Sequence, residues 1–126
     1  MDTDKQLRVV IVDDHADIRE LLGLRIEQLG HHVVGKAASG EQGVELCGEL
    51  QPDLVLLDMS MPGLGGLAAL PLIGEASPES QVVVLSGHDE SHGRDAALAA
   101  GAAAYVEKSL RIDLGAIIES VTAGRS

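Results

Sequence analysis

Strand-type and helix-type patterns alternate five times along this chain of 126 residues. Each strand-type run is short, apolar and rich in Val, Ile, Leu or Ala, as expected of strands buried on both faces. The predicted strands are residues 7–12, 32–37, 53–57, 81–85 and 103–107. Such alternation is typical of right-handed βαβ units, whose helices cover both faces of a parallel sheet. We therefore predict an α/β fold, a three-layer αβα sandwich.

Glycine and proline mark the ends of the intervening helices. The predicted helices are 18–29, stopped by Gly30; 39–51, stopped by Pro52; 90–100, stopped by Gly101; and 110–121. A further helical pattern runs from about Gly65 to Glu75, but Pro71 lies inside it. Because proline lacks the N–H that a helix interior requires, we expect this helix to be short, kinked or late in starting.

The composition fits one domain spanning 1–126, with flexible ends at about 1–5 and 123–126. A single cysteine, Cys47, excludes an internal disulfide and fits a reducing compartment. No apolar run approaches the roughly 20 residues of a membrane-spanning helix, and the polar start is unlike a signal peptide. We expect a cytoplasmic protein with no membrane partner.

The formal net charge of −11 argues against direct binding to nucleic acid, which needs a basic surface. Most of this charge is explained by solubility alone, since excess carboxylate keeps a surface soluble. A few acidic residues, however, stand at positions where a cation could bind. The charge therefore directs attention to acids that follow predicted strands.

Polar residues follow four of the five predicted strands. Parallel sheets of this type bind their ligands beyond the carboxyl ends of the strands, where these ends meet at one edge. In chain order the residues at these ends are Asp13 and Asp14, then Asp58, then Ser86, then Lys108. The spacing predicts that these side chains form one site.

Three carboxylates in one cleft repel one another unless a cation is present. Mg²⁺ commonly binds one or two carboxylates together with phosphate and water, and Lys108 could neutralise an acid or contact a phosphoryl oxygen. An Asp nucleophile that attacks phosphorus forms an acyl phosphate. The residues therefore indicate Mg²⁺-assisted phosphoryl transfer to Asp58.

Four motifs together resemble the receiver domains of response regulators in two-component signalling. They are Val9-Val-Ile-Val-Asp-Asp-His15, Pro52-Asp-Leu-Val-Leu-Leu-Asp-Met-Ser-Met-Pro62, Val84-Leu-Ser86 and Gly101-Ala-Ala-Ala-Tyr-Val-Glu-Lys108. They occur in order and cover nearly the whole chain. The first and last resemble receivers attached to LuxR-type helix-turn-helix domains.

The resemblance implies a flavodoxin-like sheet of strand order 2-1-3-4-5. It implies Asp58 as the phosphoacceptor, with Mg²⁺ held by Asp13, Asp14, Asp58 and the backbone carbonyl of Ser60. Ser86 and Tyr105 would form a switch pair, and Lys108 would contact the phosphoryl group. The implied domain is a signalling domain rather than an enzyme, with self-phosphorylation and autodephosphorylation as its intrinsic chemistry.

The implied partners are a histidine kinase and a C-terminal or separate output domain. A homodimer through the last two helices and the fifth strand is also consistent with the resemblance. This chain departs from the family pattern after Lys108, where it has Ser109 instead of the proline in a cis bond that often follows the lysine. It also departs at Gly65, where an acidic residue is common.

Three other functions fit parts of the sequence. A receiver-like module could bind proteins without phosphorylation, although all the expected site residues are present. A phosphatase of the dehalogenase type would need a second Asp two residues after Asp58, where this chain has Ser60. A flavin-binding domain would need aromatic side chains to stack on the flavin, and the chain has one Tyr and no Phe or Trp.

Overall fold

The computed structural model describes residues 6–59, 61, 63–87, 91–108 and 112–122. Strands and helices alternate along them without exception. The strands are β1 (Arg8–Val12), β2 (His32–Ala37), β3 (Leu54–Asp58), β4 (Gln81–Ser86) and β5 (Ala104–Glu107). The helices are α1 (Ala16–Gln28), α2 (Gly40–Leu50), α3 (Gly66–Ala76), α4 (Ser91–Ala99) and α5 (Leu114–Thr122). The strand positions match those predicted from the apolar runs.

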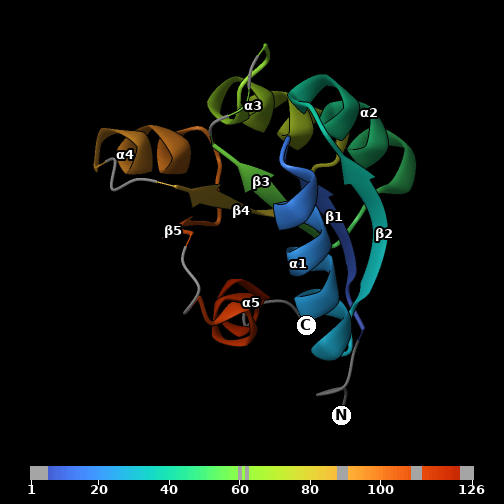
Figure 1. Ribbon diagram of the computed structural model, residues 1–126. Coiled ribbons are helices and arrows are strands. Elements are labelled where there is room, and N and C mark those ends of the chain that lie inside the picture. Colours follow the sequence, from blue (N-terminus) through green and yellow to red (C-terminus); the bar gives the residue numbers. More distant parts are fainter. Residues whose placement is uncertain (1–5, 60, 62, 88–90, 109–111, 123–126) are drawn as a thin grey trace.

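The five strands form one parallel sheet in the order β2-β1-β3-β4-β5. Figure 1 shows α1 and α5 on one face of this sheet and α2, α3 and α4 on the other. Both the three-layer prediction and the strand order implied by the family resemblance are confirmed. None of the described helices is long and apolar enough to cross a membrane.

Alternate residues of each strand enter two separate cores, because successive side chains of a strand point to opposite faces. In β3, for example, Val55 and Leu57 pack towards α2, α3 and α4, whereas Leu54 and Leu56 pack towards α1 and α5. All four are fully buried. The central strands are thus held on both faces, and their carboxyl ends are fixed relative to one another.

The helix predicted from about Gly65 to Glu75 is confirmed as α3. Of the effects expected of Pro71, a short helix and a late start are wrong. Helix α3 runs over eleven residues with Pro71 in its interior. Pro71 is exposed, and the side chains that anchor the helix, including Leu70 and Ile73, are buried in the core. Burial of this apolar face offsets the lost backbone hydrogen bond, so tertiary packing overrides the local preference.

Several predictions fall on residues outside the described ranges. These are the ends at 1–5 and 123–126, the backbone carbonyl of Ser60, the bond from Lys108 to Ser109, and the first residues of the last predicted helix. The start predicted for the last helix is wrong, because Ile112 and Asp113 are not helical and α5 begins at Leu114.

Candidate functional site

The polar residues predicted to share one site lie at the same edge of the sheet. Asp13 follows β1, Asp58 is the last residue of β3, Ser86 is the last residue of β4, and Lys108 follows β5. Three backbone hydrogen bonds extend the ladders to these positions, joining Asp13 N to Ala37 O (3.0 Å), Met59 N to Leu85 O (2.8 Å) and Lys108 N to Ser86 O (2.6 Å). The sheet itself therefore sets the relative positions of these residues.

The Lys108 side chain lies between two buried carboxylates. Its Nζ donates to Asp13 Oδ2 at 2.7 Å and lies 3.1 Å from Asp58 Oδ1. Only 1% of the Asp13 side chain and 2% of the Asp58 side chain are exposed, against 21% for Lys108. Buried charges are tolerated when they are paired, so Lys108 compensates part of the negative charge of this edge.

The environment of Lys108 favours its charged form. Burial alone would lower the pKa of this lysine, but hydrogen bonds and charge interactions with Asp13 and Asp58 outweigh burial and raise the pKa above its ordinary value. The ammonium group is therefore a fixed positive charge next to Asp58 at neutral pH.

A second set of contacts surrounds Asp13, Asp14 and His15. The His15 N–H donates to Asp13 Oδ1 at 2.9 Å, and His15 Nδ1 lies 3.1 Å from Asp14 Oδ1. One ligand atom from each of Asp13, Asp14, His15 and Asp58 lies within 4.8 Å of the others. These four residues form what we call the acidic cluster.

The acidic cluster fits a divalent cation. Asp14 Oδ1 is a buried carboxylate oxygen that accepts no hydrogen bond from the described residues. An oxygen in that state is costly unless a cation or water satisfies it. Carboxylate oxygens are the ligands that Mg²⁺ prefers, so Asp13, Asp14 and Asp58 are suited to hold Mg²⁺ at this edge.

Gly66 lets α3 approach this edge closely. A Cβ at Gly66 would overlap the backbone carbonyl oxygen of Asp58, so any other residue would push the start of α3 away from the carboxyl end of β3. The Gly66 N–H also donates to the Met59 carbonyl at 3.3 Å. The glycine that follows Gly65 in the sequence therefore has a packing role beside Asp58.

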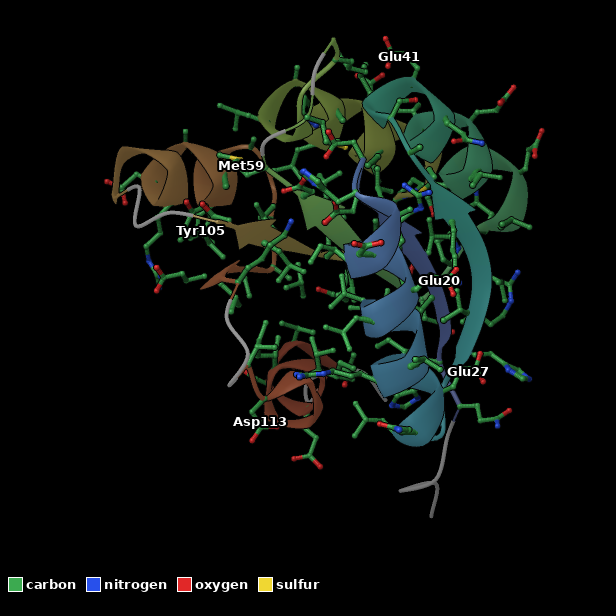
Figure 2. All side chains as sticks on the ribbon, in the orientation of Figure 1. Glu20, Glu27, Glu41, Met59, Tyr105 and Asp113 are labelled. Atoms are coloured by element: carbon green, nitrogen blue, oxygen red, sulfur yellow. The ribbon has the colours of Figure 1, made fainter. Side chains whose placement is uncertain are left out.

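Ser86 and Tyr105 lie on the same face of neighbouring strands. Val84 is paired with Tyr105, and Ser86 with Glu107, so Ser86 and Tyr105 both face the α4 side. Ser86 is buried and Tyr105 is half-buried against the core of that face. Figure 2 shows Tyr105 and Met59, the residue after Asp58, on the side of the molecule that carries α4.

The structure thus brings together Asp13, Asp14, Asp58 and Lys108, as predicted, with Ser86 joined to Lys108 through the backbone. Tyr105 lies within β5, three residues before Lys108, and is therefore further from the acids. The sequence did not predict the contact of His15 with Asp14. The only signal was the position of His15 directly after the two acids. Cys47 is buried in the core, and burial raises its pKa to about 11.

The family model and the curated relatives that match this chain indicate the same family. Residues 9–121 match the model of the response regulator receiver domain. The chain is 39% identical over 103 residues to the response regulator GacA of Pseudomonas viridiflava, covering 81% of this chain and 48% of that protein. It is 38% identical to the response regulator UvrY of Escherichia coli K12, covering 81% and 47%. The chain therefore spans about half the length of these curated relatives.

Solved structures agree with this assignment. A two-component response regulator of the LuxR family from Aurantimonas sp. SI85-9A1 is 34% identical, with a TM-score of 0.89 over 96% of this chain and 88% of that one. The signal receiver domain of the putative response regulator NarL from Mycobacterium tuberculosis is 31% identical, with a TM-score of 0.83 over 96% and 99%. The comparisons favour a receiver of the LuxR type, and the chain belongs to the response regulator receiver domains of two-component systems.

Proposed function

We propose that Asp58 is the residue that accepts the phosphoryl group in this receiver domain. The observation that carries this assignment is the contact between Asp58 and Lys108, 3.1 Å apart, at the sheet edge that also holds Asp13 and Asp14. Asp58 ends the central strand β3, so its carboxylate is held by a backbone buried on both faces. A nucleophile fixed in this way needs little reorganisation before reaction.

We assign Mg²⁺ binding to Asp13, Asp14 and Asp58, with the Ser60 carbonyl as a further ligand by family resemblance. When bound, Mg²⁺ supplies neutralisation of negative charge on the carboxylates and on a phosphoryl group. The contact of Lys108 with both Asp13 and Asp58 supplies a second positive charge from the chain itself. Together they would offset the charge that increases at this edge when a phosphoryl group arrives.

In the proposed reaction an Asp58 carboxylate oxygen attacks the phosphorus of a phosphohistidine. The O–P bond forms as the P–N bond breaks, and the departing imidazole keeps the electron pair and takes up a proton. The donor would be a histidine kinase of a two-component system, or a small phosphodonor in self-phosphorylation. Water attacking the same phosphorus would return Asp58 to its carboxylate. We propose that this reaction takes place in the cytoplasm.

We propose that Ser86 and Tyr105 report the phosphorylated state. Ser86 shares a backbone hydrogen bond with Lys108 and ends the strand next to β3. These contacts support a movement of its hydroxyl towards a phosphoryl group on Asp58. Tyr105 lies on the same face of β5, half-buried next to Val84. Inward movement of its ring would change the surface of α4, β5 and α5, where a partner, an output domain or a second copy would bind.

The proposal is tested by incubating the protein with acetyl phosphate and Mg²⁺ and recording its intact mass. We expect one phosphoryl adduct, which EDTA abolishes and Asp58→Asn prevents. Asp53→Asn is the matched control, because Asp53 lies before β3, at the opposite end of the strand from Asp58. An adduct of unchanged yield on Asp58→Asn would refute the assignment. No adduct on folded wild-type protein would favour a module that works without phosphorylation.

A further inference from the structure

We propose that His15 is a direct metal ligand in the acidic cluster and that it shifts the metal preference of the site towards first-row transition metals such as Co²⁺. This inference rests on the proposed function, because it concerns the same metal site. The carboxylates alone are sufficient to bind Mg²⁺, which is a hard cation that prefers oxygen ligands. The imidazole adds a donor of a different kind, which a site for Mg²⁺ alone does not need.

The backbone of His15 holds its ring next to the carboxylates. His15 precedes α1 in an extended conformation, and its N–H donates to Asp13 Oδ1 at 2.9 Å. Its carbonyl accepts the first hydrogen bond of the helix, from Arg19 N. The side chain itself makes no capping hydrogen bond to the helix. The imidazole is therefore available for the acids rather than used to start α1.

The distances fit ligation of one ion. His15 Nδ1 lies 3.1 Å from Asp14 Oδ1 and 3.4 Å from Asp13 Oδ1. Ligands about 2.1 Å from a common ion lie roughly 3.0 Å apart when adjacent and about 4.2 Å apart when opposite. The limit of 4.8 Å that encloses the ligand atoms of all four residues is close to this span. Small side-chain rotations would complete the coordination.

Lys108 and a metal ion would contact different oxygens of these carboxylates. Lys108 contacts Asp13 Oδ2, on the other side of that carboxylate from the oxygen nearest to His15. Asp14 Oδ1, the oxygen nearest to His15 Nδ1, is buried and accepts no hydrogen bond from the described residues. An ion between these two atoms would satisfy that oxygen without displacing Lys108.

The kinds of ligand atom in the acidic cluster predict which metal ions it prefers. Carboxylates suit Mg²⁺ and Mn²⁺, whereas imidazole nitrogen suits Co²⁺, Ni²⁺, Cu²⁺ and Zn²⁺. A site with carboxylates and one imidazole therefore gains more affinity for Co²⁺ than for Mg²⁺. Because 67% of the His15 side chain is exposed, an ion can reach the nitrogen without any rearrangement of the core.

The test measures metal binding to the metal-free 126-residue protein by calorimetric titration with Mg²⁺, Mn²⁺ and Co²⁺, at one pH and ionic strength. His15→Phe removes the nitrogens and keeps a ring. We expect it to weaken Co²⁺ binding by about tenfold or more, the scale seen when contacts around a metal are lost. The loss for Mg²⁺ should be at least about fivefold smaller than that for Co²⁺.

His32→Phe is the matched control, because His32 is similarly exposed but starts β2, at the far end of the sheet from the acids. We expect it to leave all three affinities unchanged. A second readout is the visible spectrum of bound Co²⁺, whose bands should shift in His15→Phe and not in His32→Phe. Thermal melts without metal establish that each variant is folded.

An unchanged ratio of Co²⁺ to Mg²⁺ affinity in His15→Phe would overturn the inference. The wild-type results separate this failure from failure of the proposed function. If wild-type protein binds Mg²⁺ and accepts a phosphoryl group on Asp58 while His15→Phe weakens all metals equally, only the role of His15 is refuted. If wild-type protein binds no metal, the metal site and the role of His15 both fail.

Discussion

Lys108 shows how one side chain can serve both the fold and the site. It offsets two of the three carboxylates gathered at the sheet edge, through contacts of 2.7 Å and 3.1 Å. A lysine in such a place stabilises the folded state by pairing with buried carboxylates. The cost is a site that still carries net negative charge, a common compromise between stability and function.

The raised pKa of Lys108 predicts how its stabilising effect depends on pH. A pKa raised on folding contributes stability that is fully present below the unfolded value of 10.5 and is lost as pH rises through the folded value. We expect Lys108→Met to lower the free energy of unfolding at pH 8, with a difference from wild type that shrinks above pH 10.5. Urea denaturation at several pH values, without added metal, measures this.

Lys36→Met is the control for this experiment. Lys36 pairs with Glu20 at 3.2 Å on an exposed surface, where an ion pair contributes little. Its stability difference should be small at every pH. If Lys108→Met showed a difference that grew with pH, the charge assignment of Lys108 would be incorrect.

At the level of elements, α3 begins without a side-chain cap. Its N-cap residue is Gly65, which has φ −71° and ψ 172°, values open to any residue. A Cβ there would make only ordinary contacts, the nearest being 3.6 Å from the Met61 carbonyl. The start of α3 therefore lacks the side-chain hydrogen bond that a capping residue would supply.

Gly65→Ser should therefore raise the free energy of unfolding by about 0.5 kcal/mol, because a serine hydroxyl can accept a hydrogen bond from the first turn of α3. Gly66→Ala, one residue later, should lower it by more than about 2 kcal/mol, because its Cβ would overlap the Asp58 carbonyl. Chemical denaturation of both variants measures this. Equal effects of the two substitutions would contradict the packing described for the start of α3.

The strands and their order of appearance could be predicted from the sequence because buried parallel strands are continuous apolar runs with clear ends. For the same reason the convergence of Asp13, Asp58 and Lys108 could be predicted. The full length of α3 could not be predicted, because Pro71 is a local signal against a helix. The burial of Leu70 and Ile73 that stabilises this helix depends on tertiary packing. The contact of His15 with Asp14 depends on a side-chain rotation that no residue pattern encodes.

For the whole molecule, the arrangement of layers concentrates negative charge at one edge and leaves the cores apolar. The two cores lie on opposite faces of the sheet (Figure 1), and the acids lie where β1 and β3 end between them. A bound cation would relieve repulsion at this edge and favour only the folded state. Binding of a cation at this edge would therefore be coupled to the stability of the entire domain.

Mg²⁺ should raise the free energy of unfolding of the wild-type protein, by about 2.7 kcal/mol when its concentration is 100 times the dissociation constant. Asp13→Asn should lose most of this gain, because it removes one charged ligand. Thermal melts with Mg²⁺ or with EDTA measure the difference. A gain of the same size in both proteins would mean that Mg²⁺ binds elsewhere.

The central claim, that Asp58 carries the phosphoryl group, is tested most directly by locating the group on the chain. Borohydride reduces an aspartyl phosphate to homoserine, so protein treated with acetyl phosphate and Mg²⁺ can be reduced, digested and sequenced by tandem mass spectrometry. We predict homoserine at position 58 and intact aspartate at positions 13 and 14. Homoserine at position 13 or 14, with aspartate retained at 58, would contradict the assignment.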